Sequence, residues 1–239
     1  MKIVALDSSG LVASVAILED NLLIAEYTIN YKKTHSQTLL PMLDEITKQI
    51  DLDFETIDRI AVAKGPGSFT GLRIGSATAK GLGLALQLKI VGIPTLHALA
   101  YNLYGSSQVI CPIMDARREQ VYTGIFTFEG KEENGERSFE LQVLKDQSAM
   151  PIQEIVEELN QRKREVIFLG DGVPVYREIL KEIMKVPYSF APAGFNRQRA
   201  ATIGILATKG YPVEDASFHK PEYLRLSQAE RERIAQESK

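Results

Sequence analysis

The order of the expected strands and helices constrains this chain more than any single motif. Apolar runs with partial alternation predict strands, and runs with an apolar residue every three or four positions predict helices. In the first half these patterns predict strands at residues 2–7, 11–18, 22–30, 60–63 and 90–93 and helices at 36–50, 70–86 and 95–104. In the second half they predict strands at 109–114, 120–128, 139–144, 166–169 and 188–190 and helices at 152–161, 173–185 and 200–209. Each half therefore begins with three strands, a helix, a strand and a helix.

Two tandem units of this order predict an α/β fold of two ribonuclease-H-like domains that face each other. By analogy, this is the actin-like (ASKHA) architecture of actin, Hsp70 and the sugar kinases. We expect the first domain at 1–105 and the second at 106–198. Residues 199–225 are expected to pack back on the first domain, and 226–239 to form a charged tail. The polar segment 129–138 is expected to be a loop.

Composition and charge favour an ordinary globular protein. Of the 239 residues, 44% are hydrophobic and 25% are charged, and the formal net charge is −3. A chain that binds nucleic acid by itself needs clustered lysine and arginine, so this charge disfavours direct nucleic-acid binding. The single cysteine, Cys111, excludes an intrachain disulfide and fits a reducing compartment. The N-terminus is typical of a strand and no apolar run reaches membrane-spanning length, so we expect a cytoplasmic protein without a membrane partner.

A glycine turn, Gly65-Pro66-Gly67, separates an apolar strand from the helix at 70–86. Ser68 or Thr70 can serve as the N-cap of that helix. A turn of this kind at a helix N-terminus often holds an anion, because free backbone N–H groups point into it. The spacing matches neither the P-loop nor the dinucleotide fingerprint, for which Gly71 comes one residue late. The favoured interpretation of these glycines is a structural turn at which two backbone segments pass closely.

The same helix carries a small residue at every fourth position: Gly71, Gly75, Ala79 and Gly83. These residues share one face of the helix. Each glycine lowers the stability of a helix by roughly 1 kcal/mol relative to alanine. The face is therefore expected to pack very closely against something. Packing within the domain and docking of another protein are both compatible with the sequence.

Two aspartates end corresponding strands of the two halves, Asp7 in the first and Asp115 in the second. In the actin-like architecture such residues meet in the cleft, where paired carboxylates can position Mg²⁺ through water. Each aspartate could equally cap its own turn. Arginines after Asp115 could bind a phosphate or a carboxylate. The candidate nucleotide or anion cleft comprises Asp7, Ser8, Gly65, Gly67, Ser68, Asp115, Arg117 and Arg118.

Other catalytic signatures are missing. The three histidines, His35, His97 and His219, do not pair with one another at metal-ligand spacing. The sequence contains no Gly-x-Ser-x-Gly motif and no cysteine–histidine motif near Cys111. We therefore expect neither a metal site nor a catalytic residue in this chain.

Segments spread along nearly the whole chain resemble one family. They are Ala5-Leu6-Asp7-Ser8-Ser9, His35-Ser36 with Leu39-Leu40-Pro41, Ala79-Lys80-Gly81-Leu82, Asp115-Ala116-Arg117-Arg118 and Tyr223-Leu224-Arg225. The most specific is Gly65-Pro66-Gly67-Ser68-Phe69-Thr70-Gly71-Leu72-Arg73-Ile74-Gly75. Together they resemble the bacterial tRNA threonylcarbamoyladenosine biosynthesis proteins of the TsaB (YeaZ) family.

The resemblance implies a role in threonylcarbamoyl transfer to the tRNA adenosine next to the anticodon. It implies a catalytic paralogue, TsaD, and a small ATPase, TsaE, as partners, a homodimer when alone, and contact with tRNA only through the complex. ATP and Mg²⁺ would enter only through partner subunits. The paralogue carries a His-x-x-x-His metal motif, whereas the comparable stretch here runs from His97 to Tyr101, so the second ligand is absent. A non-catalytic partner subunit is the implied role.

The resemblance also implies that helices of the first half contact the partner. The residues expected at that interface are Leu39, Leu43, Ile46, Gly71, Leu72, Gly75, Ala79 and Gly83. Three alternatives remain: an ATP-dependent kinase or ATPase of the same fold, a metallopeptidase-like protein, and a direct tRNA-binding module. The first needs a working Mg-nucleotide site at Asp7 and Asp115, the second lacks its histidine pair, and the third is disfavoured by the charge.

Overall fold

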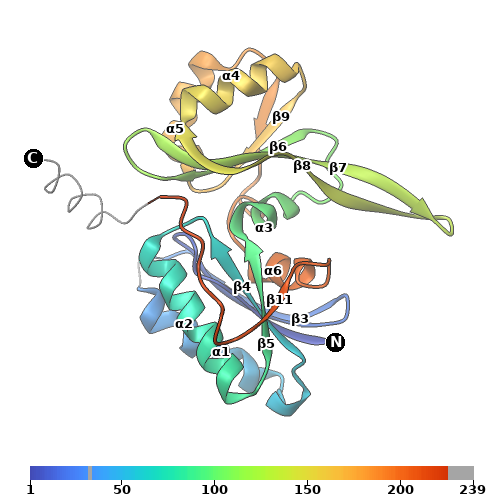
Figure 1. The fold of residues 1–239 in the computed structure, drawn as a ribbon. Coiled ribbons are helices and arrows are strands. Elements are labelled where there is room, and N and C mark those ends of the chain that lie inside the picture. Colours follow the sequence, from blue (N-terminus) through green and yellow to red (C-terminus); the bar gives the residue numbers. More distant parts are fainter. Residues whose placement is uncertain (32–33, 226–239) are drawn as a thin grey trace, which may run out of the picture.

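The computed structural model describes residues 1–31 and 34–225, which form two lobes stacked on each other (Figure 1). The predicted charged tail at 226–239 lies outside the described residues. Each lobe is built around one mixed sheet with helices on its faces.

The first lobe contains a six-stranded sheet in the order β11-β5-β4-β1-β2-β3. Its strands are β1 (Lys2–Asp7), β2 (Ala13–Glu19), β3 (Leu22–Ile29), β4 (Arg59–Gly65), β5 (Lys89–Pro94) and β11 (Val213–Asp215). The first three strands are antiparallel, and β4 and β5 run parallel to β1. Helices α1 (His35–Gln49) and α2 (Phe69–Ala85) pack on one face, while α6 (Ala200–Leu206) packs on the other. A short 3₁₀ turn, η1 (Phe54–Thr56), precedes β4.

The second lobe contains a five-stranded sheet in the order β10-β9-β6-β7-β8. Its strands are β6 (Val109–Asp115), β7 (Gln120–Glu133), β8 (Glu136–Pro151), β9 (Val166–Leu169) and β10 (Tyr188–Phe190). Helices α4 (Ile152–Arg162) and α5 (Gly172–Ile183) cover one face. Strand order and direction repeat those of β1 to β5, so the predicted repetition is confirmed.

Helix α3 (Thr95–Tyr101) lies between the two lobes and belongs to both cores. Its Ala98 and Tyr101 join the cluster of the first lobe, whereas Leu96 and Leu99 join the cluster of the second. One short helix buried on two sides thus connects the two cores, and the cleft lies between the lobes.

The prediction of a loop at 129–138 is wrong. Strand β7 extends to Glu133 and β8 begins at Glu136, and the two form a long ribbon that projects from the body (Figure 1). Asn134 and Gly135 both have positive φ, +53° and +80°, as a two-residue hairpin turn requires. Polar residues on both sides of the ribbon gave no apolar alternation, and the Asn-Gly pair was the signal that could have identified it.

Candidate functional site

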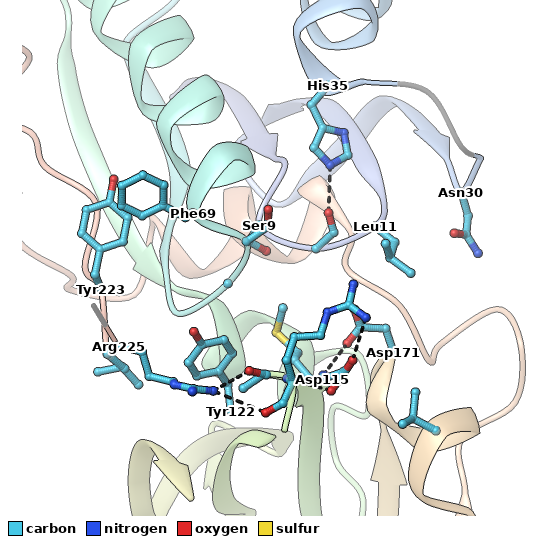
Figure 2. A pocket seen from close by; sticks show the side chains of 18 of the residues that line it. Ser9, Leu11, Asn30, His35, Phe69, Asp115, Tyr122, Asp171, Tyr223 and Arg225 are labelled. Atoms are coloured by element: carbon cyan, nitrogen blue, oxygen red, sulfur yellow. Dashed lines mark hydrogen bonds and ion pairs between the residues drawn. The ribbon is translucent and has the colours of Figure 1, made fainter. Parts of the chain in front are cut away.

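A cleft of about 990 Å³ opens between the two lobes (Figure 2). The first lobe contributes the turn after β1, His35 of α1 and the start of α2. The second lobe contributes the end of β6 with its turn, and Asp171 and Val175 at the start of α5. Residues Tyr223, Leu224 and Arg225 complete the lining from the C-terminal part of the chain.

The turn after β1 is held together by Asp7 and His35. The amide and hydroxyl of Ser9 both donate to Asp7 Oδ1, at 2.9 and 2.6 Å. His35 Nε2 lies 2.8 Å from the carbonyl oxygen of Gly10. Asp7 itself is fully buried behind the cleft wall, and burial raises the pKa of its carboxyl to about 6. In this structure Asp7 supports the wall and does not line the cleft.

The predicted glycine turn meets the turn after β1 at close range. The amide of Ser68 donates to the carbonyl of Ser9 at 2.7 Å, and a Cβ on Gly67 would overlap that same carbonyl oxygen. Ser68 also caps α2, because its hydroxyl accepts from the amide of Gly71 at 3.3 Å. Glycine is thus required because two backbone segments cross here.

On the second lobe, two carboxylates lie side by side. The amide of Asp115 donates to Asp171 Oδ1 at 3.3 Å. Asp115 Oδ1 in turn accepts from the amide of Arg117 at 2.9 Å and from the hydroxyl of Tyr176 at 3.2 Å. Burial raises the pKa of Asp171 and, with Asp115 nearby, raises the pKa of Tyr176 to about 12. The Arg117 guanidinium lies 3.6 Å from Asp115 Oδ2, and Arg197 is a second cation near Asp171.

The structure brings together only part of the predicted cleft set. Gly67, Ser68, Asp115 and Arg117 line the cleft. Those that do not line it are Asp7, Ser8 and Gly65, which are buried, and Arg118, which is exposed. The two predicted aspartates therefore do not meet at the cleft surface. No group of three or more histidine, cysteine, aspartate or glutamate side chains is placed to hold a metal in residues 1–31 and 34–225.

The eight residues predicted to contact a partner are buried within their own lobe, so their side chains are not exposed to a partner in this structure. They are Leu39, Leu43, Ile46, Gly71, Leu72, Gly75, Ala79 and Gly83. The small face of α2 packs on the sheet: a Cβ on Gly71 would overlap the carbonyl oxygen of Ser8, and one on Gly75 would lie 2.6 Å from Ser8 Oγ. A Cβ on Gly83 would lie 2.7 Å from Cβ of Ala216. The helices can offer a partner only their opposite, exposed sides.

Reasoning from residue patterns gave no role to the aromatic group at the mouth of the cleft. The ring of Tyr223 packs on Phe69 at 4.8 Å, and the Arg73 guanidinium lies 4.0 Å from the centre of the Phe69 ring. Arg225 donates to the carbonyl oxygens of Ala116 and Arg117 on the second lobe (Figure 2). The segment Tyr223-Leu224-Arg225 stood out only through the family resemblance.

Two sheets of this order with a cleft between them define the class: this is an actin-like α/β protein. The family described as "TsaD: tRNA N6-adenosine threonylcarbamoyltransferase" matches residues 23–233. The chain is 34% identical to the tRNA threonylcarbamoyladenosine biosynthesis protein TsaB of Bacillus subtilis, over 96% of each chain. It is 30% identical to the TsaB protein of Escherichia coli, over 94% of this chain and 95% of that protein. The chain belongs to the TsaB family.

Among solved structures, YeaZ from Pseudomonas aeruginosa has the same fold, with a TM-score of 0.73 and 24% identity. That similarity covers 93% of this chain and 99% of the YeaZ chain. Within the described residues, we find no helix whose length and apolar character would let it span a membrane.

Proposed function

We propose that this protein is a non-catalytic partner subunit in tRNA threonylcarbamoyladenosine biosynthesis. In this role it supports a TsaD-type subunit that transfers the threonylcarbamoyl group from threonylcarbamoyl-AMP to the tRNA adenosine next to the anticodon. A TsaE-type ATPase joins the same complex, through which tRNA is reached. The observation that carries the proposal is the match to the Bacillus subtilis TsaB protein over 96% of both chains.

The environment of His97 supports the non-catalytic part of this proposal. Its Nδ1 lies 2.7 Å from the hydroxyl of Tyr211, and its Nε2 lies 3.7 Å from the Asp146 carboxylate. Burial lowers the pKa of His97, which favours the neutral ring. Tyr101, at the position comparable to the second histidine of the catalytic paralogue, is buried among aromatic rings. Neither residue lines the cleft.

The exposed side of α2 is the surface we assign to the partner. Arg73, Ala77, Gly81 and Leu84 are exposed and follow one another at helical spacing. A Cβ on Gly81 would have no heavy atom within 4 Å, so no other described part of the chain covers the helix here. Small residues at such a surface let a second helix approach closely. Without the TsaD-type subunit, a second copy of this chain would occupy the same surface.

The test of the role combines light scattering with a transfer assay. The protein is run on size exclusion alone and mixed with a TsaD-type subunit, and modification of tRNA is then measured with and without TsaE-type ATPase. We expect a heterodimer in the mixture, and transfer only when both subunits are present. A chain that ignores the subunit and turns over ATP alone would contradict the proposal and support the kinase alternative.

A charge on the exposed face of α2 tests the assigned surface. Gly81→Glu should reduce the heterodimer at least tenfold, because a partner would bury the new carboxylate without a counter-charge. Gly194→Glu is the matched control, since Gly194 is also exposed with no atom within 4 Å of an added Cβ. Light scattering on both variants measures pairing. Equal pairing of the two variants would move the interface to another surface.

A further inference from the structure

Residues 216–225, which we call the strap, run from the first lobe to the second (Figure 1). The strap begins after β11, passes beside α2 and ends at the mouth of the cleft. We propose that the strap is an interlobe latch: it is fixed to the first lobe along most of its length, and Arg225 holds the second lobe so that the strap sets the width of the cleft. The proposal uses only this chain and does not depend on the partner role.

The first half of the strap is fixed to α2. Lys80 Nζ donates to the carbonyl oxygens of Ser217 and His219, at 3.0 and 3.3 Å. Ala216 is buried against Gly83, and His219 is 1% exposed, with its Nδ1 2.6 Å from Glu214 Oε1. This end is therefore part of the core of the first lobe.

The second half of the strap is fixed to the end of β4 and the start of α2. The amide of Glu222 donates to the carbonyl of Lys64 at 2.6 Å, and their side chains form an ion pair at 3.4 Å. A Cβ on Gly65 would overlap the carbonyl oxygen of Glu222, so the strap passes directly over this residue. The ring of Tyr223 then packs on Phe69 (Figure 2). These contacts hold the strap up to two residues before Arg225.

Arg225 crosses to the turn between β6 and β7. Its guanidinium donates to the carbonyl oxygens of Ala116 and Arg117, the latter at 3.5 Å. Arg117, Arg118 and Glu119 in this turn all have positive φ, at +66°, +56° and +58°. Each such residue costs roughly 1–2 kcal/mol relative to the right-handed region, so the turn needs external support. A guanidinium on its carbonyls supplies that support from the other lobe.

Two backbone hydrogen bonds within this turn can be used to detect whether the latch is closed. The amide of Ala116 donates to the carbonyl of Gln120 at 2.9 Å, and the amide of Gln120 donates to the carbonyl of Arg117 at 3.2 Å. If the latch opens, the strained turn relaxes and these amides lose protection. The exchange rates of peptides covering 115–120 therefore measure the latch directly.

Hydrogen exchange of the full chain with Arg225→Ala is the test. We expect exchange in 115–120 to become about tenfold faster, because a hydrogen bond from a charged donor is lost, while the cores of both lobes stay unchanged. Lys220→Ala is the matched control: it removes the same charge from the strap at an exposed residue. Lys80→Ala, which frees the other end, should speed exchange in 216–225 more than in 115–120.

Small-angle scattering on the same variants measures the cleft. Arg225→Ala should increase the radius of gyration relative to Lys220→Ala. Equal exchange of 115–120 in these two variants would overturn the latch, as would faster exchange throughout both lobes. Faster exchange in the turn with unchanged scattering would overturn the claim that the strap sets the width of the cleft.

Discussion

Among single residues, Asp7 is the clearest case in which the sequence predicts one environment and the structure shows another. The residue ends β1, which predicts a cleft position for its carboxylate. Alternation along the strand places it on the same face as Ile3 and Ala5, which α6 covers. The side chain is therefore fully buried, and its Oδ2 has no hydrogen-bond partner among the described residues. Helix α6, which covers this face, begins at Ala200, so the local sequence around Asp7 does not show that the face is buried.

The buried carboxyl predicts a pH dependence of stability. The pKa of Asp7 is about 6 in the folded chain, against 3.8 for an ordinary aspartate, because burial disfavours the charge. Between about pH 4 and pH 6 the folded state holds a proton that the unfolded state has lost, so stability falls as the pH rises. Asp7→Asn removes this pH-dependent loss of stability, because asparagine does not titrate. Relative to the wild type, the variant should gain about 2 kcal/mol between pH 4 and pH 7, because the unfolded state is already more than half ionised at pH 4.

Urea unfolding at the two pH values measures this difference. Ser14→Ala is the control that should leave the pH dependence of stability unchanged. Ser14 is also buried beneath α6 but has no titratable group. A constant gap between wild type and Asp7→Asn would show that the folded environment leaves the acidity of Asp7 unchanged.

At the scale of elements, local periodicity predicted most helices and strands within a few residues, because their apolar faces are built into the sequence itself. It missed β11, which has only three residues, and the outer β7–β8 ribbon, which has no apolar face. It also left the small face of α2 open to two interpretations. Spacing shows that Gly71 and Gly75 share a face, but the atoms they touch belong to Ser8, more than sixty positions earlier.

Helix α2 offers a matched pair of substitutions. Gly71→Ala should destabilise the fold by about 1–3 kcal/mol, because its Cβ would overlap backbone of the turn after β1. Gly81→Ala should stabilise it by about 0.5–1 kcal/mol, because its Cβ meets open space in a helix interior. Thermal or urea unfolding of the two variants checks both signs. A loss of stability in Gly81→Ala would mean that this side of the helix is covered in the free protein.

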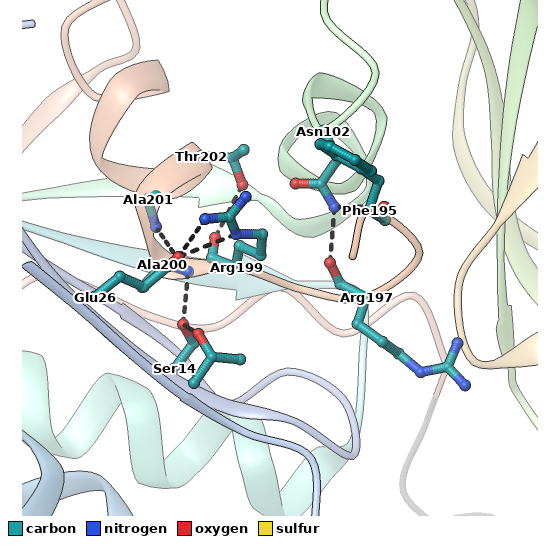
Figure 3. Close-up of polar contacts among 10 residues, drawn as sticks. Ser14, Glu26, Asn102, Phe195, Arg197, Arg199, Ala200, Ala201 and Thr202 are labelled. Carbon is teal, nitrogen blue, oxygen red and sulfur yellow. Dashed lines mark hydrogen bonds and ion pairs between the residues drawn. The ribbon is translucent and has the colours of Figure 1, made fainter. Parts of the chain in front are cut away.

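At the scale of the whole molecule, Glu26 connects strand β3 to the start of helix α6, which lies far along the chain (Figure 3). Its carboxylate accepts from the amide of Ala201 at 3.0 Å and from Arg199 Nε at 3.0 Å. The neighbouring amide of Ala200 donates to Ser14 Oγ at 2.9 Å. Strands β2 and β3 thus receive the first turn of α6, which the chain reaches only after completing the second lobe.

Removing this junction should weaken the whole fold. Glu26→Ala leaves a half-buried guanidinium and a buried amide without their acceptor, and we expect a loss of about 2–3 kcal/mol. Glu26→Gln, which keeps an acceptor oxygen, should lose less. Glu129→Ala on the exposed ribbon is the control for the same chemical change. Urea unfolding that fails to separate Glu26→Ala from this control would show that α6 is held by packing alone.

The cleft shows which parts of the candidate site can be predicted from sequence patterns. Sequence patterns predicted a cleft between two repeated units, and four residues of the predicted set line the cleft in the structure: Gly67, Ser68, Asp115 and Arg117. The sequence predicted that residues 199–225 pack back on the first domain but not that Arg225 contacts the second lobe, because this contact joins residues 108 and 109 positions apart. Contacts of that range depend on the completed fold.

The placement of α6 and β11 has a consequence for how the protein is made. Both elements complete the sheet of the first lobe, yet they follow the entire second lobe in the chain. During synthesis on the ribosome, the second lobe is finished while one face and one edge of the first sheet are still uncovered. Translation that stops between the lobes would release a nascent chain with an exposed sheet, a substrate for chaperones and proteases rather than a usable half-protein.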